Sequence, residues 1–155
     1  AQKAVDNTRT VGVALSPCII PEIGKPGFPI GDGEMELGMG IHGEKGIQRC
    51  ALKTADHTVE AIWDIIDSDF PIPRGSSVAV LVNSLGATPR EELYILYRKL
   101  HSILISGGIA ISKALIGEFA TSMEMTGASI SVIKLDDELA AYLGKPADSP
   151  LFPRP

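Results

Sequence analysis

The stretch that decides the fold reads Glu34-Met35-Glu36-Leu37-Gly38-Met39-Gly40-Ile41-His42-Gly43-Glu44. Its apolar residues fall at every second position, which places them on one face of a predicted β-strand running to about Ile41. The opposite face carries Glu34, Glu36, Gly38, Gly40 and His42. Glycines inside a strand usually mark a close approach to the backbone, so this face is predicted to be clear of side chains in front of His42. A small ligand could then reach the histidine.

The rest of the chain alternates between predicted strands and amphipathic helices, which indicates an α/β layer architecture. Strands are expected at residues 11–15, 34–41, 77–82, 109–115 and 129–135, and helices start near Thr54, Thr88 and Asp136. Strands that are covered on both faces tend to be continuously apolar, whereas residues 34–41 alternate. The sequence therefore predicts an α/β protein, a two-layer sandwich of the α+β type, with a mixed β-sheet and helices mainly on one face.

Local signals define two of the helices and one long loop. The run Thr88-Pro89-Arg90-Glu91 suggests Thr as N-cap, Pro at the first helical position and Glu three residues after the cap. Residues 17–33 contain four prolines and are expected to form a loop without regular structure. Helical spacing predicts two buried stripes, one of Val59, Ile62, Trp63 and Ile66 and one of Leu93, Leu96, Tyr97, Leu100 and Leu104.

Composition excludes several classes of protein. The 155 residues are 45% hydrophobic and 21% charged, values typical of one ordinary globular domain. A net charge of −5 without a Lys/Arg run argues against nucleic-acid binding. No apolar run approaches the roughly 20 residues of a membrane span, and no signal peptide is evident, so a cytoplasmic protein is expected. Two cysteines, Cys18 and Cys50, do not suggest a disulfide framework.

The letters of residues 38–43 match G-x-G-x-x-G, the dinucleotide-binding fingerprint. That fingerprint works where its last glycine opens a helix whose N-terminus holds a pyrophosphate. Here the glycines lie inside a strand pattern, and no helix signal follows before Thr54. A nucleotide site is therefore not predicted.

Other catalytic patterns are also weak. His42, Glu44, Cys50 and His57 lie close together in sequence, but their spacing is not that of metal ligands on one face, so no metal site is predicted. Ser84 is not in a nucleophile elbow. Polar residues at the predicted element ends have structural explanations, Asn83 and Thr88 as turn and cap residues and His57 and His101 as surface residues.

His42 itself has two explanations. A histidine at a strand end can bond to turn backbone through its ring nitrogens, which is a purely structural role. It can also serve as a neutral nucleophile beside the cleared glycine face. The residues alone leave both possibilities open.

A family resemblance bears on this choice. Residues 34–46, EMELGMGIHGEKG, closely resemble the segment of the dihydroxyacetone kinase family that carries its substrate-binding histidine. Further segments match in the same order, namely VGVALSPC at 11–18, GKP at 24–26, VNSLGATP at 82–89, ELY at 92–94, LIGE at 115–118, TS at 121–122, MTG at 125–127 and LDDE at 135–138. Together they span nearly the whole chain.

The resemblance implies a role for this segment. Residues 1–155 are identified as the second, C-terminal half of the substrate-binding (K) subunit or domain, with a proline-rich tail at 145–155 and the N-terminal half absent. His42 stands where the family's histidine adds to the carbonyl carbon of the ketone and holds it as a covalent hemiaminal. Dihydroxyacetone and glyceraldehyde can be trapped in this way, but glycerol cannot. The family commonly has proline where this chain has Lys45, a change in the turn that is expected to be tolerated.

The resemblance also implies that other groups complete the reaction. A second histidine and an aspartate that act on the hydroxyl belong to the N-terminal half, so this fragment alone is expected to be inactive as a kinase. The phosphoryl donor, ATP with magnesium or a phosphorylated carrier, binds another domain or subunit, and no cofactor is expected on this chain. A homodimer is implied. Two alternatives stay open, a regulatory coactivator subunit without catalytic activity and a kinase for another small ketose such as erythrulose.

Overall fold

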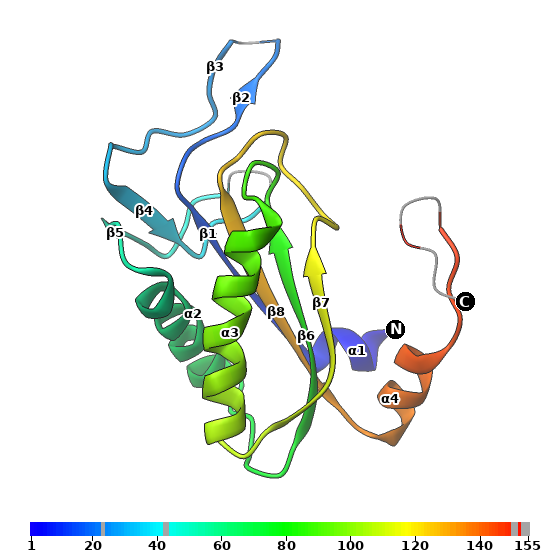
Figure 1. The fold of residues 1–155 in the computed structure, drawn as a ribbon. Coiled ribbons are helices and arrows are strands. Elements are labelled where there is room, and N and C mark those ends of the chain that lie inside the picture. Colours follow the sequence, from blue (N-terminus) through cyan, green and yellow to red (C-terminus); the bar gives the residue numbers. More distant parts are fainter. Residues whose placement is uncertain (23, 42–43, 150–151, 153–155) are drawn as a thin grey trace.

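The structure, a computed structural model, describes residues 1–22, 24–41, 44–149 and 152. Six strands form one mixed sheet in the order β5-β4-β1-β8-β6-β7 (Figure 1). Their bounds are β1 Thr8–Ala14, β4 Glu34–Leu37, β5 Gln48–Ala51, β6 Ser77–Ser84, β7 Ala110–Gly117 and β8 Gly127–Leu135. Within this sheet β6 and β7 run parallel and the other neighbouring pairs are antiparallel. The predicted mixed α/β fold is confirmed.

The long helices α2 (Ala55–Asp69) and α3 (Arg90–Ser106) lie side by side over one face of the sheet (Figure 1). The short helices α1 (Gln2–Asp6) and α4 (Asp137–Gly144) lie apart from them, near the two chain ends. One face of the sheet holds both long helices, as predicted.

The two short helices are joined by an ion pair. Lys3 on α1 lies 2.5 Å from the carboxylate of Asp136, the N-cap of α4, and this hydrogen bond is the main reason that the pKa of Lys3 rises to about 12.

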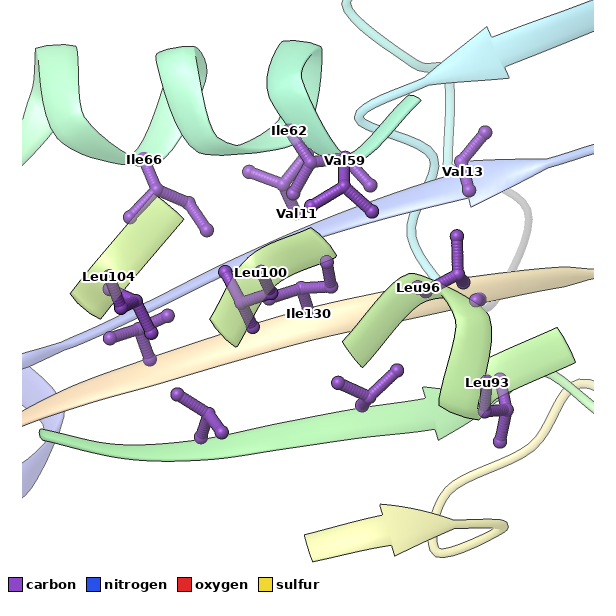
Figure 2. Close-up of a cluster of buried hydrophobic side chains, with 14 of the residues drawn as sticks. Val11, Val13, Val59, Ile62, Ile66, Leu93, Leu96, Leu100, Leu104 and Ile130 are labelled. Atoms are coloured by element: carbon purple, nitrogen blue, oxygen red, sulfur yellow. The ribbon is translucent and has the colours of Figure 1, made fainter. Parts of the chain in front are cut away.

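The core fills the space between these helices and the sheet (Figure 2). Both predicted helical stripes are buried there, although Trp63 and Tyr97 are only partly covered. The strands supply side chains from alternate positions, namely Val11, Val13, Met35, Leu37, Val78, Val80, Val82, Ile130 and Val132. The apolar side chains that repeat about every 3.6 residues in the helices and every second residue in the strands therefore pack together in one layer.

Strand β4 ends earlier than predicted. Met35 and Leu37 face the core as expected, but the strand stops at Leu37 and does not reach Ile41. The reason is Gly38, which has φ +78°, a left-handed conformation that breaks the extended backbone. The segment that carries Gly38, Gly40 and Ile41 is a loop. The alternation of apolar residues in the sequence therefore extends beyond the end of the strand.

Three further strands were not predicted. Residues 17–33 are not wholly irregular, because β2 (Ile19–Ile20) and β3 (Lys25–Pro26) pair as a small antiparallel ribbon outside the main sheet. Strand β5 forms the edge of the main sheet beside β4. Each has two to four residues, which is too short for a periodic pattern to show.

Helix α3 begins one residue later than the capping pattern predicted. Pro89 is the N-cap, and its carbonyl oxygen accepts the amide of Glu92 at 3.1 Å. The buried Thr88 hydroxyl instead accepts the amide of Gly127 at 2.9 Å, which joins the start of α3 to β8. The interpretation of Thr88 as a cap is therefore wrong, whereas Asp136 caps α4 by accepting the amide of Leu139 at 2.8 Å.

This contact predicts the effect of a substitution. Thr88→Val keeps the shape of the side chain but leaves the Gly127 amide without its acceptor, which should lower the free energy of unfolding by about 1–2 kcal/mol. Thr88→Ser retains the hydroxyl and should lose less. Urea unfolding of both variants measures the difference, and equal stability of the two would contradict the role of this hydrogen bond.

Candidate functional site

His42 and Gly43 lie outside the described residues, so the site is built from the frame around them. The described frame consists of β4, β5 and the flanking segments 38–41 and 44–47. The amide of Ile47 donates to the carbonyl of Leu37 at 2.7 Å, which closes the connection at its base. His42 is thus part of a connection between two paired antiparallel strands.

A buried carboxylate ties this connection together. Glu36, only 5% exposed, accepts hydrogen bonds from Nη2 of Arg49 at 2.8 Å and Nε at 3.2 Å. It also accepts the amide of Gly46 at 2.7 Å. Arg49 lies directly opposite Glu36 in the β4–β5 register. The guanidinium, opposed by burial and helped by the Gly46 amide, holds the pKa of Glu36 below its ordinary value, so the charged pair persists at neutral pH.

The glycines of the loop do not leave an open shelf. A Cβ at Gly38 would lie 2.6 Å from the side chain of Ile47, and a Cβ at Gly40 would collide with the carboxylate of Glu44. The space beside both glycines is therefore occupied by side chains from the returning half of the connection. The prediction that these two glycines clear a face of side chains is therefore wrong, because they permit close packing within the loop.

The other side of the loop is seated on the sheet. The amide of Gly38 donates to the carbonyl of Gly12 at 2.7 Å, and a Cβ at Gly12 would collide with the carbonyl oxygen of Met39. Met39 is buried in a second apolar cluster with Ala14, Cys18, Leu85 and Met125. The loop is thus anchored by backbone contact with the middle of β1 and by one buried methionine.

Neighbouring loops at this end of the sheet are held by buried polar side chains. Asn83, only 2% exposed, accepts the amides of Phe119 and Ala120 at 2.8 and 3.0 Å and donates to the Ala120 carbonyl at 2.7 Å. Asn83 is therefore a strand residue that fixes the loop after β7, whereas a turn residue was predicted. The carboxylate of Glu124 accepts the amide of Ile19 at 2.6 Å and secures the β2–β3 ribbon.

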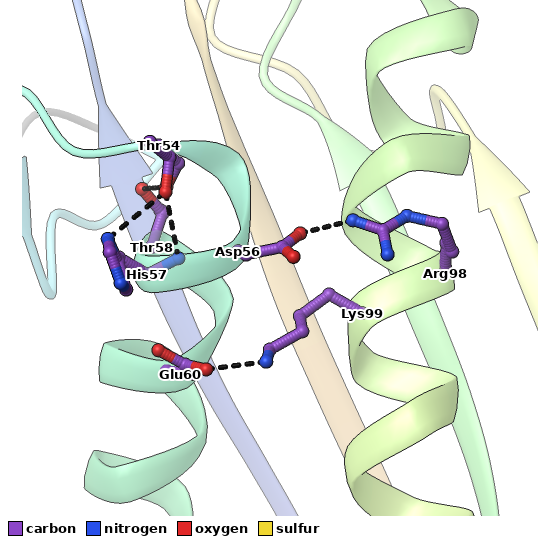
Figure 3. A network of polar contacts seen from close by, with 7 residues as sticks. All are labelled: Thr54, Asp56, His57, Thr58, Glu60, Arg98 and Lys99. Atoms are coloured by element: carbon purple, nitrogen blue, oxygen red, sulfur yellow. Dashed lines mark hydrogen bonds and ion pairs between the residues drawn. The ribbon is translucent and has the colours of Figure 1, made fainter.

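The other two histidines are exposed, as predicted. His57, in the first turn of α2, contacts the Thr54 hydroxyl at 3.2 Å through Nδ1 (Figure 3). Beside it, Lys99 pairs with Glu60 at 2.5 Å between the two long helices, and Arg98 pairs with Asp56. His101 packs edge-on against Tyr97. The two ion pairs link α2 and α3, and none of these contacts includes the described frame around His42.

The described residues show neither a cluster of metal ligands nor a membrane span. Over these ranges, no three His, Cys, Asp or Glu side chains come together in an arrangement that could hold a metal ion. Cys18 and Cys50 are both free thiols. None of the helices in the described part of the chain has the length and apolarity needed to cross a bilayer.

Sequence reasoning missed the residues that frame His42. Glu36 was placed on the strand face opposite the apolar residues, without a partner. Arg49 lay in no predicted element, and Gly12 was an ordinary residue of a strand. One signal was present in the sequence. The acidic residue Glu36 lies inside an apolar strand, and a carboxylate in such a position requires a partner if the strand is covered on both faces.

Comparisons with known proteins place these features in a family. A family model described as the Dak1 domain matches residues 1–151. The chain is similar to the dihydroxyacetone-binding subunit DhaK of PTS-dependent dihydroxyacetone kinase 2 from Listeria innocua, with 45% identity over 152 residues, which are 98% of this chain and 46% of the relative. It is also similar to L-erythrulose kinase from Pectobacterium atrosepticum, with 36% identity over an alignment of 156 positions that covers 98% of this chain and 26% of that enzyme.

Solved structures agree with the sequence comparisons. The fold is similar to that of DhaQ, a dihydroxyacetone kinase operon co-activator, with a TM-score of 0.83, 26% identity and coverage of 94% of this chain and 46% of that one. It is also similar to the native dihydroxyacetone kinase of C. freundii, with a TM-score of 0.80, 29% identity and coverage of 98% and 28%. The chain spans less than half the length of each of these four proteins. Since the family model matches nearly every residue, the chain belongs to the Dak1 domain family.

Proposed function

We propose that this chain binds dihydroxyacetone, or a similar small ketose, covalently through His42, as part of a dihydroxyacetone kinase. The observation that supports this most strongly is that the Dak1 match runs through the β4–β5 connection, whose two ends are held together by Glu36, Arg49 and Gly46. A nucleophile in such a connection can be presented in a fixed position. The choice of substrate class is supported by relatives that are named as dihydroxyacetone-binding subunits.

The proposed step is an addition. The unprotonated ring nitrogen of neutral His42 donates its lone pair to the carbonyl carbon, and the carbonyl π electrons move to oxygen. The oxygen takes up a proton, and the other ring nitrogen releases its proton, so the hemiaminal is neutral. Glycerol has no carbonyl group and is not trapped. Because only neutral imidazole attacks, adduct formation should weaken as the pH falls through about 6.5, the value of an unperturbed histidine.

The role within a kinase follows from holding the substrate. A hemiaminal fixes the ketose so that its terminal hydroxyl can meet a phosphoryl group, and such orientation can contribute several kcal/mol to lowering the barrier. We assign the phosphoryl donor, the acid and base that act on the hydroxyl, and the second half of the substrate site to partner domains or subunits. A homodimer and a cytoplasmic location belong to the same proposal.

Substitution of the histidine tests this proposal. Full-length chain incubated with dihydroxyacetone at pH 8 should show one bound ketose by native mass spectrometry, and His42→Ala should abolish that species. His57→Ala is the matched control and should retain it, because His57 lies on the exposed surface of α2. Retention of the adduct by His42→Ala, or no adduct with the unmodified chain, would contradict the proposal.

Two further experiments distinguish a dihydroxyacetone kinase from an erythrulose kinase and from a regulatory subunit. A relative that phosphorylates erythrulose makes a four-carbon ketose a second candidate substrate. Adduct formation measured with equimolar dihydroxyacetone and erythrulose reports the preference directly. A regulatory role, suggested by the similarity to a co-activator, predicts adduct formation without phosphoryl transfer when a complete kinase system is supplied.

A further inference from the structure

Glu36 is an unusual residue for its position. It lies on the strand face that points away from α2 and α3, yet the side chain is 7% exposed and charged. Burial of a carboxylate is unfavourable unless it is paired and hydrogen-bonded. In Glu36 the two carboxylate oxygens share three hydrogen bonds, two from the guanidinium of Arg49 and one from the amide of Gly46. The bonds reach strand β5 and the last part of the loop.

These partners flank the loop on its returning side. Gly46 precedes Ile47, whose amide closes the base of the connection, and Arg49 follows on β5. A Cβ at Gly46 would lie 2.6 Å from Cγ of Glu36, so the backbone of residue 46 packs directly on this side chain. On the outgoing side, the loop is held by the Gly12 carbonyl and by burial of Met39. Glu36 therefore holds the returning half of the loop at Gly46, whereas β1 holds the outgoing half at Gly38.

We propose that Glu36, together with Arg49, is a positioning residue that holds the loop in the conformation in which His42 adds to the ketose. This inference rests on the proposed function of His42. Glu36 acts through the Gly46 amide and the β5 strand and does not touch the substrate. A loose loop must be ordered when the adduct forms, and ordering one residue costs free energy equivalent to about a tenfold change in an equilibrium constant.

Three substitutions in the full-length chain test the assignment. Glu36→Gln keeps the shape and one acceptor but removes the charge, and Arg49→Gln removes the guanidinium from a side chain that is 40% exposed. Arg49→Lys keeps the charge without the paired donors. The matched control is Glu60→Gln, which removes an ion pair of 2.5 Å with Lys99 between α2 and α3.

Two measurements are compared for each variant. The first is the equilibrium constant for the dihydroxyacetone adduct, measured by NMR of the ketone carbon labelled with ¹³C. The second is hydrogen exchange of the Gly46 and Ile47 amides relative to the amides of Leu100 and Leu104 in α3. Glu36→Gln and Arg49→Gln should weaken the adduct about tenfold and speed exchange at Gly46 and Ile47 by more than at α3. Arg49→Lys should give an intermediate adduct constant, and Glu60→Gln should change neither quantity.

The outcomes distinguish the two proposals. If the unmodified chain forms no adduct, the function proposed for His42 fails and the role of Glu36 fails with it. If the unmodified chain forms the adduct but Glu36→Gln and Arg49→Gln form it equally well, only the positioning role is overturned. If the loop and α3 amides accelerate by the same factor and the adduct declines only with the folded fraction, Glu36 is a purely structural residue and the inference is wrong.

Discussion

Replacing Leu100 by alanine is expected to lower the free energy of unfolding by about 3–4 kcal/mol. Leu100 lies at the middle of α3 with no exposed surface, and it packs between that helix and the sheet (Figure 2). The loss combines the transfer of the missing carbon atoms with the cavity that the close-packed surroundings cannot fill. A loss of this size is a large part of the stability of a typical domain.

Urea unfolding followed by fluorescence measures this loss conveniently. Trp63 is the single tryptophan, and it packs against the same core from α2, so its emission should report the transition. Ile105→Ala in the last turn of α3 is the control, because Ile105 is 51% exposed and its truncation should cost little. Similar midpoints for the two variants would show that the interface between α3 and the sheet is not the main core.

Replacing Gly12 by alanine is expected to displace the loop that carries His42. Gly12 lies on β1, which is distant from this loop in sequence. The new Cβ would meet the carbonyl oxygen of Met39, and backbone cannot rotate away as a flexible side chain can. The segment 38–41 must therefore move, which should cost about 2–3 kcal/mol of stability and weaken the dihydroxyacetone adduct at least tenfold. Without the contact to Met39, the substitution should raise the stability, because alanine in a strand is ordinarily more favourable than glycine.

The control for this variant is Gly144→Ala. Gly144 is the last residue of α4, and nothing lies within 4 Å of a Cβ placed there. The stability and the adduct constant of the Gly144→Ala variant should stay near those of the unmodified chain. Gly12→Ala that matches Gly144→Ala in both measurements would contradict the seating of the loop on β1.

The sequence predicted the parts of the fold that repeat a pattern. The stripes of α2 and α3 extend over several turns, and Met35 and Leu37 alternate as a strand requires. Short elements such as β5 and the β2–β3 ribbon could not be predicted, since they are defined by hydrogen bonds to distant residues. The end of β4 could not be predicted either, because a glycine inside an alternating pattern does not reveal the sign of its own φ.

The candidate site was predicted only in part. The residue types around His42 left its role open, and the resemblance to the dihydroxyacetone kinase family, confirmed by the Dak1 match, supplied the hypothesis. Glu36 and Arg49 could not be joined from the sequence, because their contact depends on the β4–β5 register across a loop of ten residues that shows no pattern of its own. The glycines were predicted to clear a face, but they allow Ile47 and Glu44 to pack against the backbone.

The central claim, that His42 bonds to the ketone carbon, is tested most directly by NMR of the adduct. Dihydroxyacetone labelled with ¹³C at its carbonyl carbon is mixed with chain whose histidine rings carry ¹⁵N. We predict that the carbon signal moves from the ketone region to that of a tetrahedral carbon with a one-bond coupling to a ring nitrogen. This coupling should vanish in His42→Ala and persist in His57→Ala and His101→Ala. A carbon signal without nitrogen coupling in the unmodified chain, or a coupling that survives in His42→Ala, would contradict the account.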